Sequence, residues 1–178
     1  EGYYEAGDIG EEVEDEDVAE EVELSSDVIG RQKRFLADIG LLDKDGYDYT
    51  LLEAGHEVGR GLSFGRDGDA TEALSELLSD WEVTDQLIED IDKGVMSEDE
   101  LVDSLAYLTE TDPSKARKKT GLTALVHLYE WVGILSQEGA NEYSRASKVD
   151  EAQEDETGEE SSQASGVKEP EESSPSRD

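Results

Sequence analysis

Residues 25–62, SSDVIGRQKRFLADIGLLDKDGYDYTLLEAGHEVGRGL, decide the fold, because they predict a helix, a short hairpin and a second helix. Apolar residues recur at helical spacing up to Ile39, and Gly40 then supplies the left-handed conformation that ends a helix at low cost. The turn signal Lys-Asp-Gly at 44–46 separates two short extended pieces, the second of them aromatic. A helix over 50–62 completes the stretch.

A partial copy of this pattern lies near the other end of the chain, in residues 115–147. Aligning Gly40 with Gly133 places residues 39–42 over residues 132–135, and the same offset of 93 places Gly46 on Gly139. In both copies a polar turn with one glycine then leads to a tyrosine. A repeat at a fixed offset points to repeated structural units, and two copies indicate a pair of small units rather than a solenoid.

The chain is strongly acidic, with 49 Asp and Glu against 15 Lys and Arg and a net charge of −34. Such a surface repels nucleic acids and anionic membranes at low salt. The composition resembles that of haloarchaeal cytoplasmic proteins, and at molar salt the Debye length of about 3 Å removes most long-range repulsion. Without cysteine the chain has no disulfide or thiolate metal site. No transmembrane run or signal-peptide pattern is present, so a cytoplasmic location is expected.

Composition and pattern divide the chain into five segments. Residues 1–24 are an acidic segment with a weak helix, because residues 1–27 hold 13 acids and no base. The first unit, 25–64, is expected to lack its first helix, which is either absent or lost before Glu1. A connecting helix spans 65–82, and the second unit spans 83–146. The acidic tail, 147–178, is expected to be disordered because its only aliphatic residues larger than alanine are Val149 and Val167.

Three predicted helices followed by a hairpin, at 83–93, 97–108, 120–132 and 134–143, resemble the winged helix-turn-helix proteins of archaea. Residues 28–62 are similar to the recognition helix, wing and C-terminal helix of that family. The resemblance implies a mainly α fold with short β-hairpin wings, built from two winged-helix-like units joined by a helix. Winged helices bind DNA, RNA or proteins, so the fold alone does not determine the ligand.

The bases give the most specific functional signal. Seven of the 15 gather in two short stretches at or just before the predicted recognition helices: Arg31, Lys33, Arg34, Lys115, Arg117, Lys118 and Lys119. In a winged-helix protein such side chains face phosphates, and Thr120, Thr123 and His127, deeper along the second helix, would face base edges. The alternative is that an acidic protein keeps these bases to pair with its own acids, an interaction that contributes little.

These observations support a non-enzymatic protein that binds double-stranded DNA without a cofactor, as a transcriptional regulator, either as one chain or as a homodimer. The alternative is a protein-interaction adaptor in a multi-subunit assembly. Trp131 is then the candidate contact, unless it packs beneath the hairpin or against the connecting helix. The tail would act as a solubilising brush or as a DNA mimic. An enzyme or metal site is not expected, because no catalytic, phosphate-binding or metal-ligand motif is present.

Overall fold

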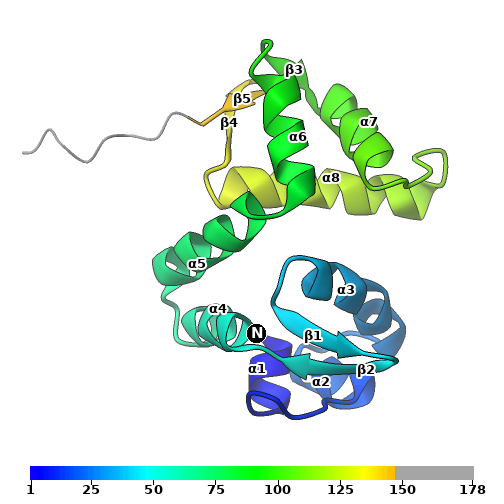
Figure 1. Ribbon diagram of the computed structural model, residues 1–178, viewed down its shortest axis with the longest axis vertical. Helices are drawn as coiled ribbons and strands as arrows, with labels where there is room; N and C mark the ends of the chain where they lie inside the picture. Colours follow the sequence, from blue (N-terminus) through cyan, green and yellow to red (C-terminus); the bar gives the residue numbers. More distant parts are fainter. Residues whose placement is uncertain (147–178) are drawn as a thin grey trace, which may run out of the picture. The chain divides into compact units, whose positions relative to one another are not determined.

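The computed structural model describes residues 1–146, which form eight helices and five short strands (Figure 1). The N-terminal half contains α1 (Gly2–Ala6), α2 (Asp15–Glu21), α3 (Ser26–Asp38), β1 (Leu42–Asp45), β2 (Asp48–Leu51) and α4 (Glu53–Ser63). Helix α5 (Asp67–Ser79) connects it to the C-terminal half, which contains α6 (Glu82–Ile91), β3 (Met96–Ser97), α7 (Glu98–Leu108), α8 (Ala116–Trp131), β4 (Leu135–Gly139) and β5 (Glu142–Arg145). The predictions for the tail, residues 147–178, lie outside the described residues.

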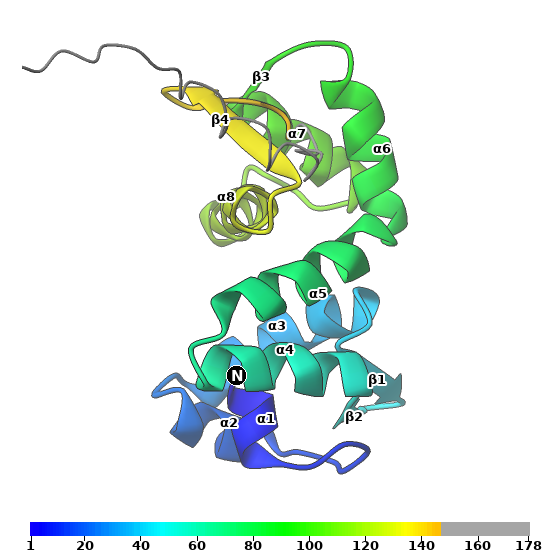
Figure 2. The same ribbon diagram turned by 90° about the vertical axis from the view of Figure 1, so that its left-hand side faces the viewer.

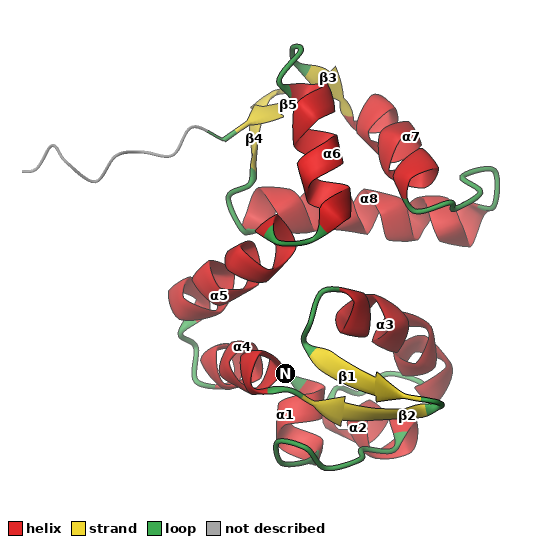
Figure 3. Ribbon diagram, in the orientation of Figure 1, coloured by secondary structure: helices red, strands yellow, loops and turns green. Residues whose placement is uncertain are grey.

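The fold is mainly helical with small antiparallel sheets, which confirms the predicted fold class at that level (Figure 3). The two halves repeat one order of elements: a helix, a short extended pairing, two helices and a hairpin. In the C-terminal half the pairing is strand β3, which joins β5 and β4 in a sheet of order β3-β5-β4. In the N-terminal half single bridges from Ile9 to Leu51 and from Glu12 to Thr50 take the place of a strand.

The ends of α3 and α8 have the same backbone geometry. Gly40 and Gly133 follow the two helices with φ angles of 80° and 73°, in the left-handed region that glycine adopts without strain. The next amide, of Leu41 or Ile134, donates to the carbonyl five residues earlier, at 2.9 Å in both halves. The predicted equivalence of residues 39–42 and 132–135 is therefore confirmed.

The predicted superposition of Gly46 on Gly139 is wrong, because a β-bulge lies between Gln137 and Gly139 in β4. A bulge adds one residue to one strand of a pair and so shifts the alignment beyond it. Gly139 pairs with Glu142, whereas its counterpart Asp45 pairs with Asp48. The shift makes Tyr49 the counterpart of Tyr143, and both tyrosines are buried.

Residues 1–24 contain two helices, α1 and α2, where the sequence predicted one weak helix. Tyr3 of α1, Val18 and Ala19 of α2, and Val13 between the two helices belong to a small hydrophobic cluster with residues from α3 and the first hairpin. The expectation that the first helix is missing from this half is wrong, because α1 takes that place. A Cβ on Gly2 would lie 2.7 Å from a methyl carbon of Val22, so this glycine lets α1 approach α2 closely. A helix of five residues is too short to show such packing as hydrophobic periodicity.

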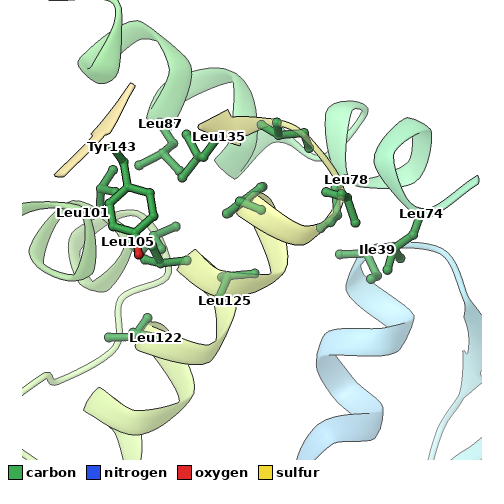
Figure 4. Packing of buried hydrophobic residues seen from close by; sticks show 14 of the residues in the cluster. Ile39, Leu74, Leu78, Leu87, Leu101, Leu105, Leu122, Leu125, Leu135 and Tyr143 are labelled. Carbon is green, nitrogen blue, oxygen red and sulfur yellow. The ribbon is translucent and has the colours of Figure 1, made fainter. Parts of the chain in front are cut away.

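The larger hydrophobic cluster fixes α8 in place. Leucines of α6 and α7 meet Tyr143 and the buried side of α8, and leucines of α5 continue the cluster toward Ile39 (Figure 4). The one fully buried polar residue in the described chain, Thr84 of α6, forms a 2.7 Å hydrogen bond with the hydroxyl of Tyr129 in α8. Helix α8 is therefore held by apolar contacts and by one specific polar contact.

Candidate functional site

Helix α8 presents one side to solvent and the other to the core. Leu122, Leu125, Val126 and Tyr129 are buried. The opposite side, called here the α8 face, consists of exposed residues at helical spacing: Arg117, Thr120, Gly121, Ala124, His127 and Trp131. Figure 2 looks almost along the axis of this helix. Nothing lies within 4 Å of a Cβ built on Gly121, so the middle of the α8 face is both open and lined by small side chains.

Helix α8 begins at Ala116, four residues earlier than predicted. The reason is local: Asp112 accepts hydrogen bonds from the amide and the hydroxyl of Ser114, at 3.0 and 2.6 Å, and this turn leads directly into a helix whose N-cap is Lys115. Arg117, Lys118 and Lys119 therefore project from the first turn of α8 rather than from a preceding loop. Their positive charges add to the partial positive charge that the helix dipole places at the N-terminus. This end of α8 is therefore strongly positive.

The sequence also carries a signal that analysis of the bases alone missed. The longest stretch without Asp or Glu is 113–129, which covers nearly all of α8, and the second longest is 28–37, which lies in α3. In a chain with 49 acids, the two longest acid-free stretches thus lie in the two helices that occupy equivalent positions in the two halves. In α8 the acid-free stretch includes most of the side of the helix that is exposed to solvent.

The bases of α8 differ in how they are engaged. Lys119 donates to Asp99 at 2.9 Å, His127 lies 3.2 Å from Glu98, and Lys115 lies 3.9 Å from Asp112. Neither Arg117 nor Lys118 forms an ion pair with a carboxylate of residues 1–146. Lys115, Lys119 and His127 each keep more than half of their side-chain surface exposed, so these contacts contribute little to stability.

The predicted polar contacts of α8 occupy different environments. The hydroxyl of Thr120 donates to the carbonyl of Ala116 at 3.0 Å but stays exposed, whereas Thr123 is half-buried at the edge of the helix. His127 is exposed in the middle of the α8 face. Trp131 remains 46% exposed at the far end of that face, so packing against the rest of the chain covers only about half of its side chain.

The bases of α3 are arranged differently from the sequence-based expectation. Lys33, predicted to face phosphates, bonds both carboxylate oxygens of Asp15 at 3.1 Å and lies 4.8 Å from the ring centre of Tyr49. Its side chain is only 24% exposed, because Asp15 at the start of α2 and the aromatic hairpin together form a site for the ammonium group. Lys33 is therefore part of the packing of this half, and its ammonium group is engaged by Asp15.

The other two bases of α3 stay on the surface. Arg31 donates from Nε to the carbonyl of Asp27 at 2.7 Å, and Arg34 lies 3.9 Å from Asp38. The acids at both ends of α3 therefore offset its bases, whereas α8 contains no acid before Glu130. The structure brings together the residues predicted on α8 and leaves those of α3 as a separate, partly neutralised group.

Burial raises the pKa of the tyrosine hydroxyls of Tyr3, Tyr129 and Tyr143 in the core, most strongly those of Tyr129 and Tyr3. Burial raises the pKa of Tyr129 to about 12, although the hydrogen bond with Thr84 acts in the opposite direction. Burial, with smaller contributions from Asp15 and Tyr49, raises the pKa of Tyr3 to about 12. All three tyrosines stay protonated at neutral pH. Among residues 1–146 no group of three or more His, Cys, Asp or Glu is placed to hold a metal ion.

Comparison with protein-family models, with curated proteins and with solved structures finds no match for this chain. No helix within the described part of the chain has the length and apolar character needed to cross a membrane. A functional proposal for this protein therefore depends on the geometry and charge of its own residues.

Proposed function

We propose that each half of residues 1–146 is a winged helix-turn-helix unit, and that the protein binds double-stranded DNA, as a regulator of transcription, through α8 of the second unit. The repeated order of elements supports the fold assignment. In the second half it runs α6, β3, α7, α8 and the hairpin β4–β5, with a three-stranded sheet. In this fold the third helix is the one that enters the major groove, which corresponds to α8.

One observation carries the proposal: most of α8, which is exposed on one side, contains no Asp or Glu, although the chain is acidic almost everywhere else. Residues 113–129 contain four bases and no acid. In this proposal Arg117 and Lys118 at the start of α8 contact phosphates. Small residues at the centre of the α8 face, Gly121 and Ala124, allow close approach to base edges, and Thr120 and His127 supply hydrogen-bonding groups there.

The same electrostatics set a limit on affinity. Each neutralised phosphate releases counterions and contributes about −0.9 to the slope of log K against log salt. With four bases at the start of α8, we expect few phosphate contacts and a slope no steeper than about −4. The net charge of −34 opposes association further, unless salt screens it. We therefore expect modest affinity that depends on fit in the groove.

Helix α3 has the equivalent position but a different role in this proposal. Lys33 is held by Asp15, Arg31 donates to a carbonyl of its own helix, and Arg34 lies 3.9 Å from Asp38 of the same helix. We therefore propose that only one of the two third helices reads DNA. This differs from the sequence-based hypothesis, in which the bases of both helices contact phosphates.

The test compares Arg117→Glu with Arg34→Glu, two variants with the same change of charge on equivalent helices. DNA affinity is measured by fluorescence anisotropy with a labelled duplex of mixed sequence, across a KCl series that extends to molar salt. We expect Arg117→Glu to abolish binding and Arg34→Glu to reduce it less than twofold. A glutamate in the first turn of α8 favours the helix dipole, so loss of folding does not explain the loss of binding. Equal binding by Arg117→Glu and wild type would contradict the proposal.

A second candidate function, a protein-interaction adaptor, is favoured by a specific observation on the second hairpin. Its tip carries Glu138 and Glu142 and no base, whereas a wing that contacts phosphates needs cations. Trp131 on the α8 face and Tyr107 on α7 are 46% and 84% exposed, and exposed aromatic residues are frequent anchors of protein contacts. Absence of DNA binding at every salt concentration, together with a co-purifying protein that Trp131→Ala releases, would support this function instead.

A further inference from the structure

Two carboxylates at the start of α7 contact side chains of Lys119 and His127 on α8. Asp99 Oδ1 lies 2.9 Å from the ammonium group of Lys119, and Glu98 Oε2 lies 3.2 Å from Nε2 of His127. Lys119 lies at the basic end of α8, and His127 lies in the middle of the α8 face. In the proposed mode of binding, DNA phosphates and base edges would approach these same two side chains.

The backbone that carries these carboxylates is fixed. Ser97 caps α7 in a reciprocal arrangement with Glu100, in which the Ser97 amide donates to the Glu100 carboxylate at 2.8 Å. Ser97 also belongs to β3 and pairs with Glu142 of β5, and the amide of Glu98 donates to the carbonyl of Asn141 at 2.9 Å. The first turn of α7 is therefore held to the sheet, and it keeps both carboxylates next to α8.

We propose that Glu98 and Asp99 act as intramolecular competitors of DNA for Lys119 and His127, and so hold the protein in a low-affinity state until a fitting DNA site displaces them. This inference rests on the proposed function of α8 and specifies how binding there is regulated. The contacts suit displacement because both bases are more than half exposed, with side-chain exposures of 52% for Lys119 and 55% for His127.

The N-terminal half contains the same kind of contact in a more enclosed form. Asp15 is the first residue of α2, as Glu98 is of α7, and it holds Lys33 of α3. There both partners are about three-quarters buried, and Tyr49 covers the ammonium group. Each half thus has a carboxylate at the start of its second helix that contacts its third helix. Only in the second half is the contacted side chain exposed to an external anion.

The test uses full-length Asp99→Asn and Glu98→Gln, with Glu89→Gln as a control that removes one charge from an exposed position on α6. Circular dichroism establishes that all three variants are folded. We expect Asp99→Asn and Glu98→Gln each to tighten binding of a mixed-sequence duplex by about two- to fivefold, the range that exposed ion pairs span. Glu89→Gln should change the affinity by less than twofold.

A second measurement needs no DNA. The hydrogen bond and charge of Asp99 raise the pKa of Lys119, so breaking the pair should increase the fraction of neutral amine. Limited acylation followed by mass spectrometry should therefore show faster labelling of Lys119 in Asp99→Asn than in wild type. Labelling of the adjacent Lys118 serves as the internal reference and should not change.

The two readouts separate the possible failures. If wild type binds DNA but Asp99→Asn and Glu98→Gln match the Glu89→Gln control, the competition is refuted and the proposed function stands. If neither wild type nor any variant binds DNA, both are wrong. If Lys119 is labelled at the same rate in wild type and Asp99→Asn, the ion pair does not persist in solution, and the competition is refuted whatever the affinities are.

Discussion

The hydrogen bond between Thr84 and Tyr129 offers a quantitative test of the packing that positions α8. Both side chains are fully buried, and their oxygens lie 2.7 Å apart. Tyr129→Phe removes one partner and leaves the hydroxyl of Thr84 without one, which costs about 1–3 kcal/mol in a buried site. Thr84→Val is the converse change and leaves the phenolic hydroxyl unpaired, so it should cost a similar amount.

The double variant Thr84→Val/Tyr129→Phe removes both polar groups and keeps the shape of the core. Its free energy of unfolding should lie within about 1 kcal/mol of wild type, because no unpaired group remains. Urea unfolding at neutral pH, followed by circular dichroism, measures all four proteins of the cycle. If the double variant loses as much stability as the two single variants together, the two hydroxyls do not interact in solution and the packing described for α6 and α8 is wrong.

Two further predictions concern the fold. Gly55→Ala should lower the free energy of unfolding in urea by about 1–3 kcal/mol, because a Cβ would collide with the carbonyl oxygen of Leu41. Gly68→Ala should raise it by about 0.5–1 kcal/mol, because a Cβ at this position of α5 would meet only open space. Raising the pH should lower stability between about pH 10 and 12, because the pKa of Tyr129 is raised to about 12 in the folded state and the unfolded chain therefore loses its proton first. The contribution of this group is complete below pH 10 and disappears as the pH passes 12, with a slope of about 1.4 kcal/mol per pH unit, and Tyr129→Phe should have a shallower slope. If the slope of Tyr129→Phe equals that of wild type, this tyrosine does not cause the alkaline sensitivity.

Signals that depend on a few neighbouring residues were predictable from the sequence. The glycines that end α3 and α8 and the two hairpins appear in the structure in the regions where the sequence predicted them. Each of these features follows from the backbone preferences of the residues within it. Sequence alone could therefore predict the mainly helical fold and the repeat, because both are built from such local signals.

Features that depend on contacts between distant residues were not predictable. The side on which Lys33 lies is decided by Asp15 and Tyr49, which are distant in the sequence. The order of residues 1–24 depends on glycines that allow helices to approach closely, and a count of charges does not detect that. The candidate site was predictable in part: the bases of α8 were found, but their pairing with Glu98 and Asp99 depends on how α7 lies against α8.

The measurement that tests the central claim most directly is the affinity of the wild-type protein for mixed-sequence duplex DNA, across KCl concentrations up to molar. The proposed role of α8 predicts measurable binding with a log–log slope between about −2 and −4, which corresponds to a few phosphates contacted by the start of α8. Absence of binding at every salt concentration, by protein that circular dichroism shows to be folded, would contradict DNA recognition by α8. It would favour a protein partner for that face.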